Sequence, residues 1–297
     1  MQMQDRIDPL IVERAPWLGA PGLGAGVARP VLNSLLSYAR TVQMAESLAQ
    51  LEARALMQKA ARMIARDVRV SGLSHIPATG PALIVANHPT GIADGLVVTR
   101  ILTALRPDVY FYANADILRV LPQLGDVIAP VEWRPEKRTQ AKTRATMAFT
   151  RAAIAQGRLG VIFPSGRLAK RHGLRLQERP WMASAATIAR KYGLPVIPVH
   201  LTACNSALFY AFDTIHPSLR DITLFHETLN KGRAPFAVRV GTPIDGGALP
   251  ACSQTAIAVL RAATLALAPA PRVGPIWRSG KGTGQPGRVR RRLEQNL

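Results

Sequence analysis

The sequence predicts an α/β fold with a mainly parallel mixed sheet flanked by helices. Between residues 67 and 246, short apolar runs alternate with longer helical patterns, which is typical of strands joined by crossover helices. With 297 residues, 48% of them hydrophobic and 19% charged, the chain can bury a large core. The body of the chain is therefore expected to be globular.

The expected strands are 68–70, 82–86, 109–112, 127–129, 159–163, 196–201 and 237–240. The expected helices are 92–105, 137–156, 181–192 and 254–267. Because ligand sites in such sheets form at the carboxyl ends of strands, polar residues that follow buried strands are the candidates for chemistry. The α/β domain is assigned to 67–271.

The flanking segments differ from this domain. Residues 15–30, rich in Gly, Pro and Ala, favour an irregular arm. From 31 to 66, apolar residues recur at helical spacing and predict one or two amphipathic helices, so 1–66 is read as an N-terminal arm and helical extension. These helices cover the core or lie on a membrane surface. Residues 272–297 are polar, Gly-rich and basic, which predicts a disordered tail.

The charge balance predicts a negatively charged partner. The chain has 38 Lys and Arg against 18 Asp and Glu, a net charge of +20. The region 134–191 alone has fourteen basic residues and only two acids, Glu136 and Glu178. Nucleic acid, an anionic membrane and a phosphorylated small molecule all fit this charge. Nucleic acid is the less favoured partner, since aromatic residues make up only 5% and no DNA- or RNA-binding motif is found.

Cysteine content and hydropathy predict the compartment. The two cysteines, Cys204 and Cys252, suggest neither a disulfide framework nor a metal site. The N-terminus carries acids and no apolar core of signal length, and no apolar run is long enough to span a membrane. We therefore expect a cytoplasmic protein that lies peripherally on the inner face of the membrane.

The stretch "ANHPTGIADG", residues 86–95, places His88 at the end of a buried strand and Asp94 in the first turn of the next helix. The carboxylate of Asp94 is favoured there by the helix dipole and can fix the imidazole tautomer. His88 could then remove a proton from a hydroxyl as a general base. The alternative is a His and an Asp that only tie the turn together.

A second stretch, "FPSGR", follows the expected strand 159–163. Gly166 permits a tight turn, and Arg167 offers a fork of donors suited to phosphate. Taken alone, this stretch favours a strand exit with a solvated basic face. Together, the two stretches offer a base and an anion holder at the same edge of the sheet.

These motifs resemble those of the glycerolipid acyltransferases typified by the bacterial lysophosphatidic acid acyltransferase. "NHPTGIAD" looks like the first motif of that family, and "FPSGR" resembles the third, Phe-Pro-Glu-Gly. "LPQLGDVIAPVEWR" resembles the second through Gly125, Ile128 and Arg134, and "LPVIPVHL" resembles the fourth, so the resemblance covers about 70–245. In two departures, Ser165 replaces the Glu of the family, and five residues rather than four separate His88 from Asp94, which the Pro-Thr-Gly turn is expected to absorb.

The resemblance implies an O-acyltransferase with His88 as general base and Asp94 as its orienting partner. The acceptor would be a lysolipid such as 1-acyl-glycerol-3-phosphate, and "NSALFY" with 217–232 resembles a branch that includes lyso-ornithine lipid acyltransferases. The donor would be acyl-CoA or acyl carrier protein, without cofactor or metal. The implied substrate-binding residues are Asn87, Gly91, Gly125, Arg134, Pro164, Ser165, Gly166 and Arg167. Two interpretations compete with this one. The first is a non-catalytic basic protein that binds nucleic acid, and the second is a catalytically inactive relative that binds lipid or membrane.

Overall fold

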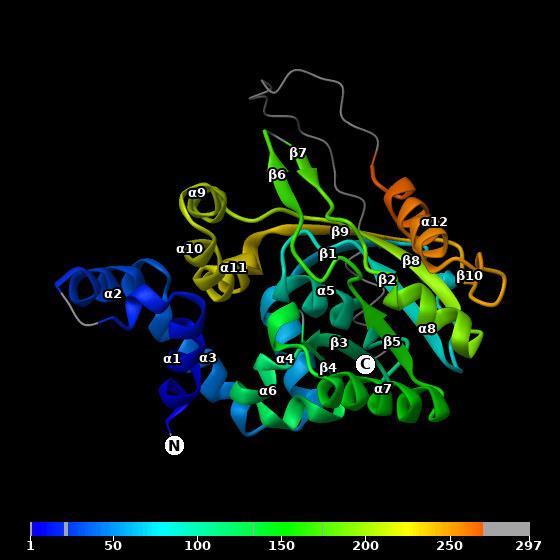
Figure 1. Cartoon of the computed structure of the whole chain (residues 1–297), viewed down its shortest axis with the longest axis horizontal. Coiled ribbons are helices and arrows are strands. Elements are labelled where there is room, and N and C mark those ends of the chain that lie inside the picture. The colour runs from blue at the N-terminus through cyan, green and yellow to red at the C-terminus, as the bar shows by residue number, and fades with distance from the viewer. Residues whose placement is uncertain (1, 21–22, 133, 174, 270–297) are drawn as a thin grey trace.

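An eight-stranded mixed sheet forms the centre of the molecule (Figure 1). The computed structural model describes residues 2–20, 23–132, 134–173 and 175–269. The strands of the sheet are β1 (Asp67–Ser71), β2 (Ala82–Ala86), β3 (Tyr110–Asn114), β4 (Ile128–Val131), β5 (Leu159–Ile162), β8 (Pro195–Thr202), β9 (Pro235–Val240) and β10 (Ile244–Asp245). Their order is β1-β9-β8-β2-β5-β3-β4, with β10 paired to β8.

The sheet is parallel through most of its width. Strands β8, β2, β5, β3 and β4 all run in one direction. Strand β9 pairs antiparallel with β8 and parallel with β1, while β10 pairs antiparallel with β8. The predicted fold class, a mainly parallel mixed sheet flanked by helices, is therefore confirmed.

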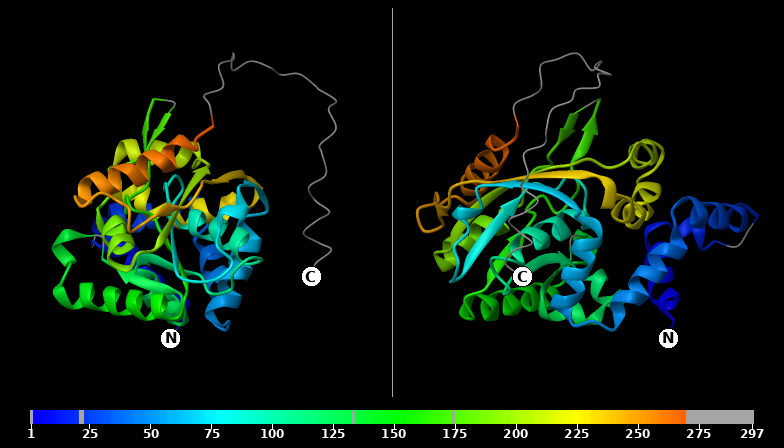
Figure 2. Two further views of the ribbon diagram at one scale, coloured as in Figure 1. Left: turned by 90° about the vertical axis from the view of Figure 1, so that its right-hand side faces the viewer. Right: turned by 180° about the vertical axis from the view of Figure 1, so that it is seen from behind.

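Helices cover both faces of the sheet (Figures 1 and 2). One face packs against α4 (Ala53–Ile64) and α5 (Ile92–Leu102), and the other against α7 (Gln140–Ala155), α8 (Ser184–Tyr192) and α12 (Ser253–Ala266). In β2, Ile84 belongs to the first hydrophobic cluster, and its neighbours Leu83 and Val85 belong to the second. Successive side chains of a strand point to opposite faces, so a strand covered on both faces has a continuous apolar sequence.

The N-terminal region adds α1 (Met3–Arg14), α2 (Leu23–Leu35) and α3 (Tyr38–Ala49) before α4. The prediction of an irregular arm over 15–30 is wrong in its second half, since α2 begins at Leu23. Gly and Pro suggested a loop there, but Val27, Val31 and Leu35 recur at the helical spacing of four. Ile7 and Leu56 belong to the same hydrophobic cluster as the sheet residue Ile84, so α1 and α4 cover the core.

The remaining elements lie around the carboxyl ends of the strands or connect them. They are α6 (Asp116–Val120), α9 (Ala207–Ile215), α10 (Pro217–Ile222), α11 (Leu224–Asn230), the 3-10 helices η1 (Pro16–Leu18), η2 (Leu73–His75), η3 (Pro122–Asp126), η4 (Pro135–Lys137) and η5 (Lys231–Arg233), and the hairpin β6 (Lys170–His172) and β7 (Arg175–Gln177). This hairpin forms a separate two-stranded sheet and projects away from the main one (Figures 1 and 2).

The predicted disordered tail, 272–297, lies outside the described residues. Within the described part of the chain, no helix has the length and hydropathy that a membrane crossing requires.

Candidate active site

The loop that carries His88 leaves the sheet at a tightly fixed point. Strand β2 ends at Ala86, and the side chain of Asn87 continues its pairing with β8: Nδ2 donates to the carbonyl oxygen of Leu201 (2.9 Å), and the amide of Leu201 donates to Oδ1 (2.7 Å). Asn87 is therefore a structural clamp between two parallel strands, although the motif suggested a substrate contact.

His88 and Asp94 meet directly. The distance between His88 Nδ1 and Asp94 Oδ2 is 2.9 Å, and the Asp94 side chain is completely buried. The same carboxylate accepts hydrogen bonds from the main-chain amides of Thr90 (2.8 Å) and Gly91 (2.9 Å) and from the Thr90 hydroxyl. These donors compensate for the burial of the charge and hold it in one orientation.

The additional residue between His88 and Asp94 is absorbed in the turn before α5. Gly91 has φ +92° and ψ −128°, a conformation that residues with a Cβ rarely adopt. The turn folds back so that Asp94, the third residue of the helix, reaches the amide of Gly91. Gly91 therefore shapes the site through its main chain. As expected, the turn absorbs the fifth residue between His88 and Asp94, and the two side chains still meet.

One ring nitrogen of His88, Nδ1, contacts Asp94, and the other, Nε2, has no hydrogen-bond partner among the described residues. Its ring stacks on the Phe163 ring, with centroids 4.5 Å apart and planes inclined by 23°. Because Nδ1 faces the Asp94 carboxylate, the neutral imidazole is oriented with its hydrogen on Nδ1 and its lone pair on Nε2. No described residue forms a hydrogen bond with Nε2, and 17% of the side chain is exposed. This nitrogen can accept a proton from a bound hydroxyl.

The "FPSGR" loop lies against the same histidine. It follows β5, and its buried Ser165 hydroxyl donates to the carbonyl oxygen of Arg167 (2.8 Å). Gly166 has φ +58°, which closes this turn. Pro164 is buried and its carbonyl accepts from Met182, while Arg167 is exposed. Further along this segment, the amide of Ala169 donates to the carbonyl oxygen of His88 (2.9 Å). The structure thus brings both predicted motifs together.

Sequence reasoning missed one acidic residue of the site, Glu178. Its carboxylate accepts from the main-chain amide of His88 at Oε2 (3.2 Å) and from the Trp181 indole at Oε1 (3.0 Å). Burial raises its pKa, against the effect of these hydrogen bonds and of the nearby His88 and Ser165. The only signal in the sequence was that Glu178 is one of two acids in a long basic region.

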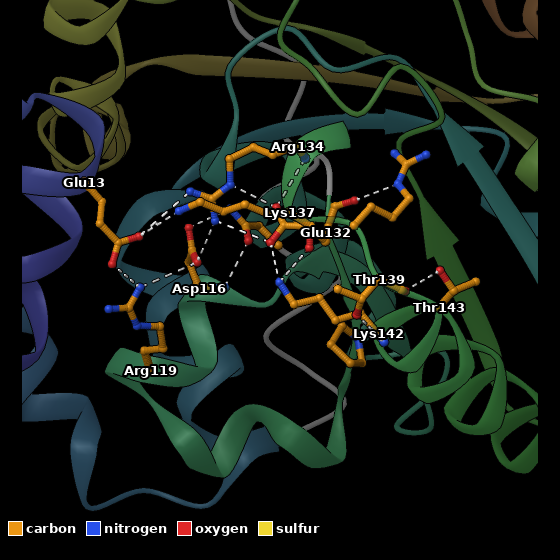
Figure 3. A network of polar contacts seen from close by, with 12 residues as sticks. Glu13, Asp116, Arg119, Glu132, Arg134, Lys137, Thr139, Lys142 and Thr143 are labelled. Atoms are coloured by element: carbon orange, nitrogen blue, oxygen red, sulfur yellow. Dashed lines mark hydrogen bonds and ion pairs between the residues drawn. The ribbon is translucent and has the colours of Figure 1, made fainter.

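Arg134 lies in a network of charges beyond β4 (Figure 3). Its Nε donates to Glu132 (2.9 Å), and it also pairs with Asp116 (3.4 Å) and, more distantly, with Glu13 of α1 (3.9 Å). Glu132 additionally accepts from Lys142 (2.9 Å). The hydrogen bond from Arg134 is the main reason why the pKa of Glu132 falls to about 2. Acidic side chains therefore surround the guanidinium that the motif assigned to an anionic substrate.

Gly125 is not brought to His88. It lies in η3, ahead of β4, and therefore at the amino edge of the parallel strands, whereas His88 follows the carboxyl end of β2. It lines a cavity of about 600 Å³ with Arg54 and Arg158, among others. The structure thus does not group Gly125 with the other predicted substrate-binding residues. Strand β4 runs between Gly125 and Arg134, so the two ends of that motif lie at opposite edges of the sheet.

The geometry places a histidine, oriented by a buried carboxylate, just after the end of a parallel strand, an arrangement suited to general-base chemistry. Residues 67–202 match the family model described as Acyltransferase. This match and the motifs point to the same family, so the family prediction made from the motifs is supported.

Two curated relatives are lyso-glycine lipid O-acyltransferases. The protein from Phocaeicola vulgatus is 26% identical over 183 residues, 60% of this chain and 64% of its own length. The protein from Bacteroides thetaiotaomicron is 23% identical over 183 residues, 60% of this chain and 65% of its own length. The match thus spans slightly less than two thirds of either relative.

Among solved structures, the crystal structure of the 1-acyl-sn-glycerophosphate (LPA) acyltransferase PlsC from Thermotoga maritima is similar, with a TM-score of 0.47 and 15% identity. The similarity covers 82% of this chain and 95% of that one.

Proposed function

We propose that the protein is a lysolipid O-acyltransferase that uses His88 as its general base. The observation that carries the proposal is the 2.9 Å contact between His88 Nδ1 and the buried Asp94 carboxylate, which leaves Nε2 to take a proton. The acyltransferase domain and the two lyso-glycine lipid O-acyltransferases support the reaction class.

In the proposed reaction, Nε2 of His88 removes the proton from the free hydroxyl of the lysolipid. The hydroxyl oxygen attacks the carbonyl carbon of an acyl thioester, either acyl-CoA or an acyl carrier protein. The carbon–sulfur bond breaks, and the thiolate leaves with the proton from the imidazolium. Asp94 orients the ring and stabilises its positive charge throughout, so no acyl-enzyme is needed.

For the acceptor, we propose a lysolipid with a negatively charged group, held by the exposed Arg167 on the loop next to His88. The names of the two relatives favour an amino-acid lipid of the lyso-glycine type over 1-acyl-glycerol-3-phosphate. The resemblance of 205–210 and 217–232 adds the lyso-ornithine type as an alternative. The net charge of +20 suits either acceptor at an anionic surface.

We further propose that the enzyme works peripherally on the inner face of the membrane. Helix α2 exposes Val27 (66%), Val31 (59%) and Leu35 (46%), which lie on one stripe of the helix. Exposed apolar side chains on a basic protein are suited to insertion among anionic lipid head groups.

The test is a transfer assay with the purified full-length protein on anionic vesicles. Acyl-CoA and acyl carrier protein are each combined with lyso-glycine lipid, lyso-ornithine lipid or 1-acyl-glycerol-3-phosphate, and mass spectrometry identifies the product. We expect a new ester with one of these acceptors, together with one thiol released per ester. Thioester loss without an ester, or inactivity with every acceptor alongside binding to DNA, would contradict the proposal.

A further inference from the structure

A second carboxylate, that of Glu178, contacts the main-chain amide of His88. Glu178 follows the β6–β7 hairpin and is separated from His88 by 90 residues of chain. Only 9% of the residue is exposed. A charged side chain is rarely buried to this extent without partners that hold it there.

The partners of Glu178 come from separate parts of the fold. One oxygen accepts the main-chain amide of His88 (3.2 Å), and the other accepts the Trp181 indole (3.0 Å). Its own carbonyl oxygen accepts from Arg261 of α12 (3.1 Å). The residue is thus fixed by both its main chain and its side chain.

The contacts of Glu178 complete a clamp on the main chain of His88. The amide of His88 is bonded to Glu178, and its carbonyl is bonded to the amide of Ala169 (2.9 Å). Asp94 holds the imidazole and Phe163 lies against its face. His88 is the first residue after the clamp of Asn87 and has left the strand, so its main-chain groups rely on this loop segment for partners.

We propose that Glu178 is a positioning residue for the acyl-transfer reaction, and that its carboxylate holds the main chain of His88 so that Nε2 faces the acceptor. The inference rests on the proposed function. It assigns Glu178 no contact with the substrate. In this chain Ser165 occupies the Glu position of the third motif, and Glu178 supplies a carboxylate beside that loop from elsewhere in the sequence.

The carboxylate is suited to this position because both of its oxygens face N–H donors. A glutamine at 178 has the same shape but only one acceptor oxygen, and its NH₂ group would face one of the two donors. An aspartate at 178 retains two acceptor oxygens on a side chain that is one methylene shorter. Glu178→Gln therefore tests whether two acceptor oxygens are needed, and Glu178→Asp tests whether the full length of the side chain is needed.

The kinetic test uses both variants, with the exposed Glu46→Gln on α3 as the control for loss of a carboxylate. In Glu178→Gln, kcat should fall roughly 10- to 100-fold, as expected for a displaced catalytic group, while the acceptor KM stays within about threefold. Glu178→Asp should retain more of kcat, and Glu46→Gln should match the wild type. An unchanged kcat in Glu178→Gln, or a raised KM with kcat retained, would overturn the positioning role.

A second measurement does not need activity. Labelling the six histidines with ¹⁵N gives a small set of amide signals, in which that of His88 is identified by its loss in His88→Ala. Since burial raises the pKa of Glu178, the His88 amide proton should shift on titration above the usual Glu range. Glu178→Gln should remove the part of this shift that the Glu178 carboxyl causes, and identical titration curves in the two proteins would contradict the contact. If the His88 amide signal of the wild type does not shift during the titration, the contact between Glu178 and His88 is refuted. Failure of every transfer assay would instead refute only the proposed function.

Discussion

His88 and Arg134 both follow parallel strands at the same edge of the sheet, but their polar surroundings differ. His88 has a carboxylate on one ring nitrogen and no described partner on the other. The guanidinium of Arg134 lies among Glu132, Asp116 and Glu13. The first arrangement leaves Nε2 of His88 available for chemistry, whereas in the second the positive charge of Arg134 is paired with neighbouring carboxylates. Position at a strand end therefore does not by itself make a residue part of the chemistry.

The largest expected effect is that of His88→Ala. Loss of a general base typically costs 10²- to 10⁴-fold, so we expect kcat to fall about 10³-fold. The imidazole is partly exposed, so the melting temperature and vesicle binding should stay close to those of the wild type. Thioester assays and thermal unfolding of the same preparations check both statements. Wild-type turnover in this variant would remove His88 from the mechanism.

Asp94→Asn should be the next most severe change. The neutral amide no longer stabilises the imidazolium that forms when Nε2 takes the proton, and wherever its NH₂ group faces Nδ1 the tautomer with the lone pair on Nε2 is lost. It also weakens the bonds from Thr90 and Gly91. We expect kcat to fall about 10²-fold, with some loss of stability because the site is buried. Equal kcat at all pH values in the two proteins would show that Asp94 only ties the turn.

Weakening the ion pairs around Arg134 tests whether they contribute to stability rather than to catalysis. Glu132→Gln should reduce the free energy of unfolding at pH 7 by about 2 kcal/mol, a figure discounted because Lys142 is half exposed. It should leave kcat within about twofold. Denaturant titrations and initial rates measure the two quantities. A large loss of kcat without loss of stability would place this network in the catalytic machinery.

The same carboxyl group predicts a pH dependence. The pKa of Glu132 is lowered to about 2 in the folded protein. Its stabilising contribution is therefore complete above the ordinary Glu value and is lost as the pH falls toward 2. The stability difference between wild type and Glu132→Gln should shrink over that acidic range. A difference that is constant with pH would indicate that the ion pairs do not cause it.

The sequence could predict the parts of the fold and site that depend on local patterns. Strand β2 is found at its predicted limits because both its faces are buried, and His88 and Asp94 were identified from their spacing after it. Partners brought together by folding were not predictable. Glu178 reaches His88 across 90 residues, and Glu13 reaches Arg134 from the first helix. Such contacts decide whether a polar residue is reactive or paired.

Arg167→Ala should have a moderate effect on the acceptor alone. Arg167 is exposed on the loop beside His88, and a charge-assisted contact to an anionic group is worth about tenfold in binding. We expect the acceptor KM to rise about tenfold with little change in kcat. A lysolipid analogue without the anionic group should be insensitive to the variant. Loss of kcat instead of an increase in KM would assign Arg167 to the reacting atoms.

Gly125→Ala should have the smallest effect, although Gly125 belongs to a family motif. A Cβ at this position has no atom within 4 Å, and the residue lies at the edge of the sheet opposite to His88. Alanine therefore needs no rearrangement, and reduced freedom of the unfolded chain should leave the stability equal or up to about 1 kcal/mol higher. Both kcat and the acceptor KM should remain unchanged. If the acceptor KM rose, the cavity lined by Gly125 would be linked to substrate binding, and the carboxyl edge would no longer be sufficient to define the active site.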